Sequence, residues 1–275
     1  MGHHALIDDE MKNPRAYGTS PFKVAVIHGG PGACGEMAPV ARALASGWGV
    51  LEPLQTATTL EGQVEELRTA LVEHGDLPVT LIGFSWGAWL SFVLAARYPT
   101  LVNKLILVGS GPFEHQYVEQ IQETRFRRLG EEERAEYESI IQMLNQPAAE
   151  GKAAAFARLG ALASQTDSFD PIPGESDESR SVANERNVFY EALRDAVEMR
   201  RSGELLELAA HIDCPVVTIH GDYDPHPVEG VEKPLSAVLE NFRLILLENC
   251  GHKPWIERQA RDRFYATLKE ELLDP

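Results

Sequence analysis

Residues 79–98 read VTLIGFSWGAWLSFVLAARY, two apolar runs joined at a single short turn. The first run, Val79 to Phe84, does not alternate apolar with polar side chains, which is typical of a strand buried on both faces of a parallel sheet. The second run, Trp86 to Tyr98, is apolar on nearly every side and is followed by Pro99. It predicts a buried helix that ends there.

Ser85 lies at the turn between this strand and this helix, with Gly83 and Gly87 two residues to either side. A serine on such a sharp turn has a strained backbone, and the glycines keep the neighbouring main chain clear of it. The helix that begins after it points its N–H groups at the serine, where they stabilise developing negative charge. We therefore interpret Ser85 as a candidate nucleophile.

Similar apolar runs on either side of this stretch predict further strands of the same sheet. Thr58 and Glu61 have the spacing of a capping box, so another helix is expected to begin near Thr58. Strands that alternate with helices indicate an α/β fold with a mostly parallel central sheet flanked by helices. The predicted strands are 23–28, 104–109, 215–220 and 242–247, with a weaker one at 50–54.

The segment from Pro112 to Ile212 interrupts this alternation, because it is rich in Glu and Ala, has helical spacing and contains no convincing strand. We expect it to be a helical cap, residues 112–212, inserted into a core formed by residues 1–111 and 213–275. Within it, residues 165–181 are dense in Ser, Asp, Gly and Pro. Loops of that length are usually lids or connectors.

A glycine-rich loop, HGGPG at 28–32, follows the first predicted strand. Its glycines allow main-chain N–H groups to approach a ligand closely. We expect the N–H groups of Gly30 and Trp86 to form an oxyanion hole. Cys34 follows this loop, but a free cysteine is more often a small buried apolar residue than a nucleophile.

An acid and a base are expected after the last two predicted strands. The run PVVTIH is followed by Asp222 and Asp224, and FRLILL is followed by a loop that carries His252. A serine needs an imidazole to take its proton, and the imidazole needs a carboxylate to fix its tautomer. The order Ser, Asp, His suits this architecture with either aspartate. We expect His28, His220 and His226 to be structural.

Four motifs together resemble the α/β-hydrolase family, and more narrowly its proline iminopeptidase branch: HGGPG at 28–32, GFSWG at 83–87, HGDYD at 220–224 and CGH at 250–252. The resemblance covers the predicted core, about two thirds of the chain. It implies that the acid is the third residue after a strand-end glycine, which from Gly221 selects Asp224 over Asp222. The triad expected is then Ser85, Asp224 and His252.

The resemblance also implies release of an N-terminal proline from a small peptide or amide through an acyl-enzyme, with cap carboxylates that bind the substrate amine. An alternative with the same chemistry is a carboxylesterase that acts on small acyl esters. An alternative of another class is a ligand-binding protein that uses the fold as a scaffold. The candidate carboxylates are Glu114, Glu119, Glu123 and Glu191.

The composition of the chain limits the kinds of molecule that it is expected to bind. The net charge of −17 disfavours nucleic acid and anionic membrane surfaces, and no apolar run is long enough for a transmembrane helix. Three cysteines without metal-site spacing, and no secretory signal, predict a cytoplasmic location. No metal-ligand spacing or dinucleotide fingerprint is present, so we expect no cofactor. The substrate is expected to be a small molecule or short peptide, and the oligomeric state is left open.

Overall fold

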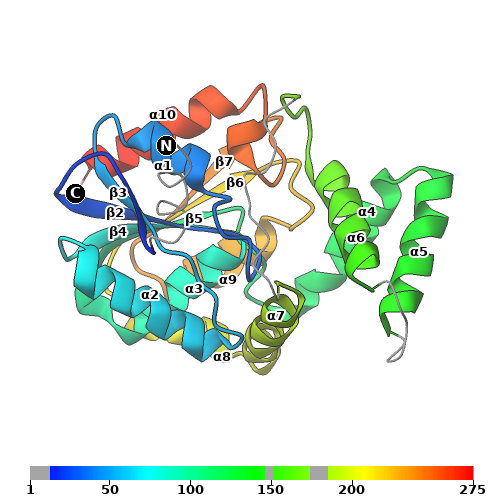
Figure 1. Ribbon diagram of the computed structural model, residues 1–275, viewed down its shortest axis with the longest axis horizontal. Coiled ribbons are helices and arrows are strands. Elements are labelled where there is room, and N and C mark those ends of the chain that lie inside the picture. Colours follow the sequence, from blue (N-terminus) through cyan, green and yellow to red (C-terminus); the bar gives the residue numbers. More distant parts are fainter. Residues whose placement is uncertain (1–12, 146–151, 174–184, 275) are drawn as a thin grey trace, which may run out of the picture.

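The structure is a computed structural model that describes residues 13–145, 152–173 and 185–274 (Figure 1). Its centre is a seven-stranded sheet in the order β1-β3-β2-β4-β5-β6-β7. β1 pairs antiparallel with β3, and all other neighbours are parallel. The strands are β1 (Arg15–Tyr17), β2 (Phe22–Ile27), β3 (Gly49–Glu52), β4 (Val79–Phe84), β5 (Val102–Val108), β6 (Val216–Gly221) and β7 (Phe242–Leu247).

The predicted strands are confirmed, and β4 and β7 have the predicted bounds. β1 was not predicted, because three residues at a sheet edge carry too little pattern to be recognised. The mostly parallel α/β architecture is the one expected from the alternation of strands and helices.

Helices cover both faces of the sheet. In Figure 1, α1 and α10 lie over one face, and α2, α3 and α9 lie over the other. The helices are α1 (Ala38–Leu44), α2 (Leu60–His74), α3 (Trp86–Arg97), α4 (Val118–Arg128), α5 (Glu131–Asn145), α6 (Lys152–Asp167), α7 (Glu185–Ser202), α8 (Glu204–Glu207), α9 (Glu229–Val238) and α10 (Arg261–Leu273). Short 3-10 helices are η1 (Pro99–Leu101), η2 (His115–Tyr117), η3 (Leu208–His211) and η4 (Pro254–Ile256).

The two helical layers explain why the strands are apolar without alternation. Along β4, Leu81 packs into the apolar cluster under α2 and α3, whereas Ile82 and Phe84 pack into the cluster under α1 and α10. Since successive side chains of a strand point to opposite faces, both sets have to be apolar.

Helix α2 begins one residue later than predicted. Its N-cap is Thr59, whose side chain accepts a hydrogen bond from the N–H of Gly62, and the helix starts at Leu60. Thr58 and Thr59 are both suitable caps by residue type. The prediction of Thr58 as the N-cap is therefore wrong, because the residue with an extended backbone and a side chain that accepts from a helix N–H is Thr59.

Between β5 and β6, the regular elements that the structure describes are all helices, α4 to α8 with η2 and η3; we call them the cap. Figure 1 shows α4, α5 and α6 projecting to one side of the sheet, while α7 lies close to α2 and α3. The predicted loop 165–181 starts too early, because residues 165–167 end α6. Its part at 174–181 lies outside the described residues. The boundary of the cap at residues 112 and 212 stays a prediction.

Among the helices described, none has the length and apolar character needed to cross a membrane.

Candidate active site

Ser85 lies on the turn between β4 and α3 with φ 51° and ψ −111°, a conformation that a residue with a side chain rarely adopts. The flanking glycines make this turn possible. A Cβ on Gly83 would lie 2.2 Å from the carbonyl oxygen of Gly87, and one on Gly87 would lie 2.4 Å from the carbonyl oxygen of Ile27. The GxSxG spacing is therefore a steric requirement of the turn that presents Ser85.

A chain of hydrogen bonds joins the three residues predicted as a triad. Oγ of Ser85 lies 3.1 Å from Nε2 of His252, and Nδ1 of His252 lies 2.7 Å from Oδ2 of Asp224. The carboxylate can only accept, so Nδ1 of His252 carries a proton and Nε2 is left to accept one from the serine. Each residue comes from a loop at the carboxyl end of a different strand: β4, β6 and β7.

The structure separates the two aspartates that follow β6. Asp224 is buried beside His252, whereas Asp222 is exposed and its Oδ1 accepts a hydrogen bond from the N–H of Cys250 at 3.1 Å. The side chain of Asp222 thus joins the loop after β6 to the main chain of the loop after β7. Asp224 is the aspartate within reach of the imidazole.

Burial and charge determine the ionisation of this pair. Burial by itself would raise the pKa of Asp224, but the His252 and His226 imidazoles outweigh it and hold the pKa of this carboxyl well below its usual range. Burial would lower the pKa of His252, but the charge of Asp224 outweighs it and raises that pKa. Asp224 is therefore ionised at neutral pH, and His252 is a stronger base than an isolated imidazole.

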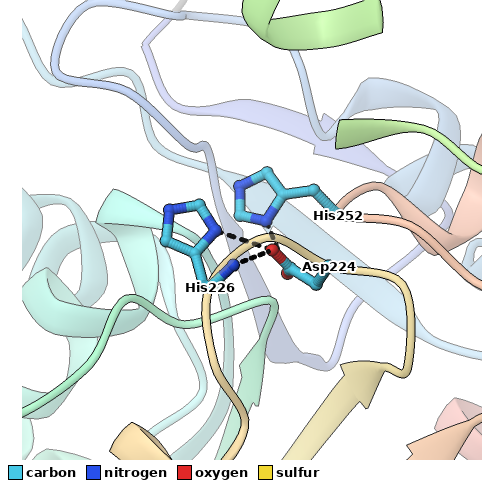
Figure 2. A group of neighbouring side chains, drawn as sticks. All are labelled: Asp224, His226 and His252. Carbon is cyan, nitrogen blue, oxygen red and sulfur yellow. Dashed lines mark hydrogen bonds and ion pairs between the residues drawn. The ribbon is translucent and has the colours of Figure 1, made fainter. Parts of the chain in front are cut away.

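Asp224 has a second imidazole partner, as Figure 2 shows. Oδ1 accepts hydrogen bonds from the main-chain N–H of His226 at 2.9 Å and from its Nδ1 at 2.7 Å. His28 and His220, in contrast, make main-chain contacts: Nδ1 of His28 donates to the carbonyl of Gly29, and Nε2 of His220 donates to the carbonyl of His226.

The glycine loop after β2 lies against the turn that carries Ser85. A Cβ on Gly29 would lie 2.7 Å from the ring of Phe84, and Gly30 has φ 26°. The N–H of Gly29 donates to Glu36 at 3.0 Å, and the same carboxylate pairs with Lys253 at 2.6 Å. Glu36 thus joins the glycine loop to the loop of His252.

Main-chain and carboxylate contacts tie the cap to the His252 loop. The N–H of His252 donates to the carbonyl of Asp167, the last residue of α6, at 2.7 Å. The buried carboxylate of Glu257 accepts from the N–H groups of Gly251, Phe169 and Asp170 at 3.1, 2.9 and 2.8 Å. The sequence did not predict the roles of Asp167 and Glu257, because neither a main-chain acceptor nor a single glutamate in a loop has a recognisable sequence pattern.

The model of the alpha/beta hydrolase fold family matches residues 52–259, a range that contains Ser85, Asp224 and His252. The chain belongs to the α/β-hydrolase fold family. This match confirms the wider of the two resemblances drawn from the motifs.

Curated relatives of this α/β-hydrolase have esterase names. It is 25% identical over 215 residues to a pimeloyl-[acyl-carrier protein] methyl ester esterase of Neisseria meningitidis serogroup A, across 77% of the chain and 63% of that relative. The chain thus spans less than two thirds of the length of this relative.

Among solved structures, the hydrolase resembles VinJ, with a TM-score of 0.65 and 18% identity over 94% of each chain. It resembles proline iminopeptidase of Mycobacterium smegmatis with a TM-score of 0.61 and 17% identity, over 94% of this chain and 93% of the other. At such identities, these likenesses show the fold alone. The iminopeptidase is one neighbour among several, so the narrower resemblance is not singled out.

The four cap glutamates predicted to bind an amine are spread over the hydrolase cap. Glu119, Glu123 and Glu191 are exposed, and Glu114 accepts a hydrogen bond from Gln116 at 2.7 Å. In the described part of the chain, none of the four hydrogen-bonds a triad side chain. Their role in substrate binding stays a prediction.

Within the described residues, one group of side chains has the composition of a metal site: Asp224, His226 and His252, whose ligand atoms lie within 4.8 Å of one another. The hydrogen bonds between the carboxylate and the two imidazoles explain this clustering without an ion. The arrangement is suited to proton transfer from a serine.

Proposed function

We propose that this α/β-hydrolase is a serine esterase that cleaves small carboxylic esters through an acyl-enzyme. The observation that carries the proposal is the hydrogen-bond chain from Ser85 through His252 to buried, ionised Asp224. Such a chain lets an alcohol act as a nucleophile at neutral pH, because the imidazole takes its proton as the bond to the acyl carbon forms.

In the first half of the reaction, Oγ of Ser85 attacks the ester carbonyl and its proton passes to Nε2 of His252. Asp224 stabilises the imidazolium that results. The carbonyl oxygen becomes negatively charged and is held by the N–H of Trp86, the first residue of α3, together with the N–H of Gly30. The imidazolium then gives its proton to the leaving alcohol.

In the second half, a water molecule attacks the acyl-enzyme with His252 as base, and the acid leaves. The proton taken from water passes through Nε2 to Oγ of Ser85, so that the enzyme returns to its starting state.

An ester is preferred to a prolyl amide as substrate for two reasons. The curated relatives have methyl ester esterase names, although the chain covers only part of their length. Three of the four carboxylates predicted to hold the amine of an N-terminal residue are exposed. An exposed carboxylate would bind the amine of an N-terminal proline only weakly, because solvent screens such a pair.

The test compares hydrolysis of a short-chain nitrophenyl ester, a methyl ester of a medium-chain acid and a prolyl nitroanilide. We expect turnover of the esters and little of the anilide, and we expect Ser85→Ala to remove the activity. The matched control is Ser236→Ala, which changes an exposed serine on α9. Preference for the anilide would replace the esterase by an aminopeptidase. Full activity of Ser85→Ala would refute the mechanism, and inert protein would favour a binding function.

A further inference from the structure

The carboxylate of Asp224 is shared between two imidazoles, one on each oxygen. Oδ2 accepts from Nδ1 of His252 at 2.7 Å. Oδ1 accepts from both the main-chain N–H and Nδ1 of His226, at 2.9 and 2.7 Å. Figure 2 shows the two rings on the same side of the carboxylate. A serine hydrolase mechanism uses the first imidazole and assigns no role to the second.

The two donors of His226 restrict how the carboxylate can rotate. A carboxylate that accepted a single hydrogen bond could turn about its Cβ–Cγ bond and present either oxygen to His252. With Oδ1 occupied by His226, only Oδ2 is available. Groups that orient the partner of a reactive side chain in this way commonly affect activity strongly.

The main chain of His226 is itself held in place by a residue of the sheet. Nε2 of His220, at the end of β6, donates to the main-chain carbonyl of His226 at 2.8 Å. The same nitrogen lies 3.7 Å from Oδ2 of Asp224, beyond hydrogen-bond length. His220 is fully buried. The position of the His226 loop is therefore fixed by a buried contact with the sheet.

The rings of His226 and His252 lie in contact, with centroids 4.5 Å apart and an angle of 30° between planes. Burial lowers the pKa of His226 despite the nearby Asp224, whereas the pKa of His252 is raised. Two charged groups of the cap also act on the pair: Arg125 lowers both pKa values, and Asp167 raises the pKa of His252. His226 is thus the neutral partner, and its Nδ1 proton stays in the bond to Asp224.

We propose that His226 is a positioning residue, which holds Oδ1 of Asp224 so that Oδ2 meets Nδ1 of His252. This role rests on the proposed esterase mechanism. His226 acts through the carboxylate and does not exchange protons with the substrate. Within the described residues, Nε2 of His226 has no hydrogen-bond partner, so the alternative that it acts as a base of its own has to be tested directly.

Two variants separate these roles. In His226→Ala both ring nitrogens are lost, and we expect kcat on the ester to fall about 10- to 100-fold, the effect of one hydrogen bond to a charged group. In His226→Asn the side-chain amide can donate to Oδ1 from nearly the place of Nδ1, and we expect most of kcat to return. KM should change little in either variant, because the proposed role acts through the carboxylate of Asp224 and not through a contact with the substrate.

The pKa of His252, measured by NMR on the free enzyme, gives a readout that does not depend on turnover. In His226→Ala, Oδ1 loses a donor and water gains access to the imidazolium. Both changes stabilise protonated His252, so its pKa should rise further and the acid limb of kcat/KM should move to higher pH. His226→Asn should show a smaller rise. A merely structural role would lower the unfolding temperature without this shift.

The matched control is His74→Asn on α2, which changes a half-exposed histidine and should leave kcat, KM and the His252 pKa as in the wild type. The proposal is overturned if His226→Ala keeps full kcat, if His226→Asn is as impaired as His226→Ala, or if only KM changes. Ser85→Ala, assayed beside them, separates the two questions. If Ser85→Ala is inactive and His226→Ala has a normal kcat, only the positioning role of His226 is refuted. If Ser85→Ala keeps full activity, the esterase mechanism itself is refuted.

Discussion

The main-chain carbonyl of Asp167 accepts a hydrogen bond of 2.7 Å from the main-chain N–H of His252. Asp167 ends helix α6 of the cap, and its side chain forms a two-point ion pair with Arg125 of α4. The loop that carries the proposed base is therefore anchored to the cap. The first prediction concerns this anchor.

Asp167→Asn should lower the free energy of unfolding by about 3 kcal/mol, because it leaves the largely buried Arg125 without its counter-charge. We also expect kcat to fall, since the carbonyl that holds His252 would move with its residue. The control is Glu136→Gln, which disrupts a similar two-point pair with Arg158 that is exposed. It should cost at most about 1 kcal/mol. Equal losses in urea unfolding would contradict the assignment of Asp167 as an anchor.

The second prediction is the pH dependence of ester hydrolysis. His252 acts as a base only when neutral, and the neighbouring Asp224 raises its pKa above the ordinary 6.5 against the effect of burial. As pH rises through this pKa, His252 loses its proton and kcat/KM should increase, with the midpoint above 6.5. Asp224 stays ionised over the same range, because its pKa is well below normal. Rates between about pH 5 and pH 9 test this, and a midpoint below 6.5 would be evidence against His252 as the base.

The third prediction concerns the steric role of the glycines. In Gly87→Ala, the new Cβ would lie 2.4 and 2.5 Å from the carbonyl oxygens of Ile27 and His28, which are main-chain atoms of a buried strand and loop. We expect a loss of about 3 kcal/mol of stability together with a loss of turnover. Gly160→Ala on α6 is the control, because nothing lies within 4 Å of its added Cβ. It should stabilise the protein by about 0.5–1 kcal/mol. Thermal unfolding of both variants measures the difference. A Gly87→Ala protein as stable as the wild type would contradict the steric role of Gly87.

The fourth prediction concerns Glu257, whose carboxylate accepts three main-chain N–H groups from two loops. In Glu257→Gln one acceptor oxygen is replaced by an amide NH₂, which faces N–H groups and leaves at least one of them without a partner. The expected cost is about 1–3 kcal/mol in unfolding free energy, with a lower kcat. The control, Glu248→Gln, changes an exposed glutamate in the same loop region and should have no effect. If both variants unfold alike, the carboxylate does not hold the two loops together.

Much of the fold could be predicted from the sequence because buried parallel strands leave an unmistakable run of apolar residues. β4, in which every residue is buried, is an example, whereas β7 has a similar apolar run but lies at the edge of the sheet and is only partly buried. The start of α2 could not be placed, since Thr58 and Thr59 are equivalent by type and only the backbone conformation distinguishes them. The segment 165–167 has a loop-like composition, yet it continues α6.

The predicted triad side chains lie within hydrogen-bond distance of one another, because the ends of parallel strands bring their loops to the same edge of the sheet. His226 was expected to be structural. Its contact with Asp224 depends on how the loop after β6 folds back, which no residue type or spacing reveals. The narrow resemblance to iminopeptidases came from short loops around the serine, and these loops serve the chemistry shared by esterases and peptidases.

The hydrogen bond between Asp167 and His252 has a consequence for how this protein could be re-engineered. In a cap exchange, the insertion of one α/β-hydrolase is grafted onto the sheet of another to obtain a new specificity. Here such a graft would also remove the main-chain acceptor of the proposed base and the N–H groups that Glu257 binds. A functional chimera would have to keep residues 167–170 with the sheet, so that the transferable module ends before the last residue of α6.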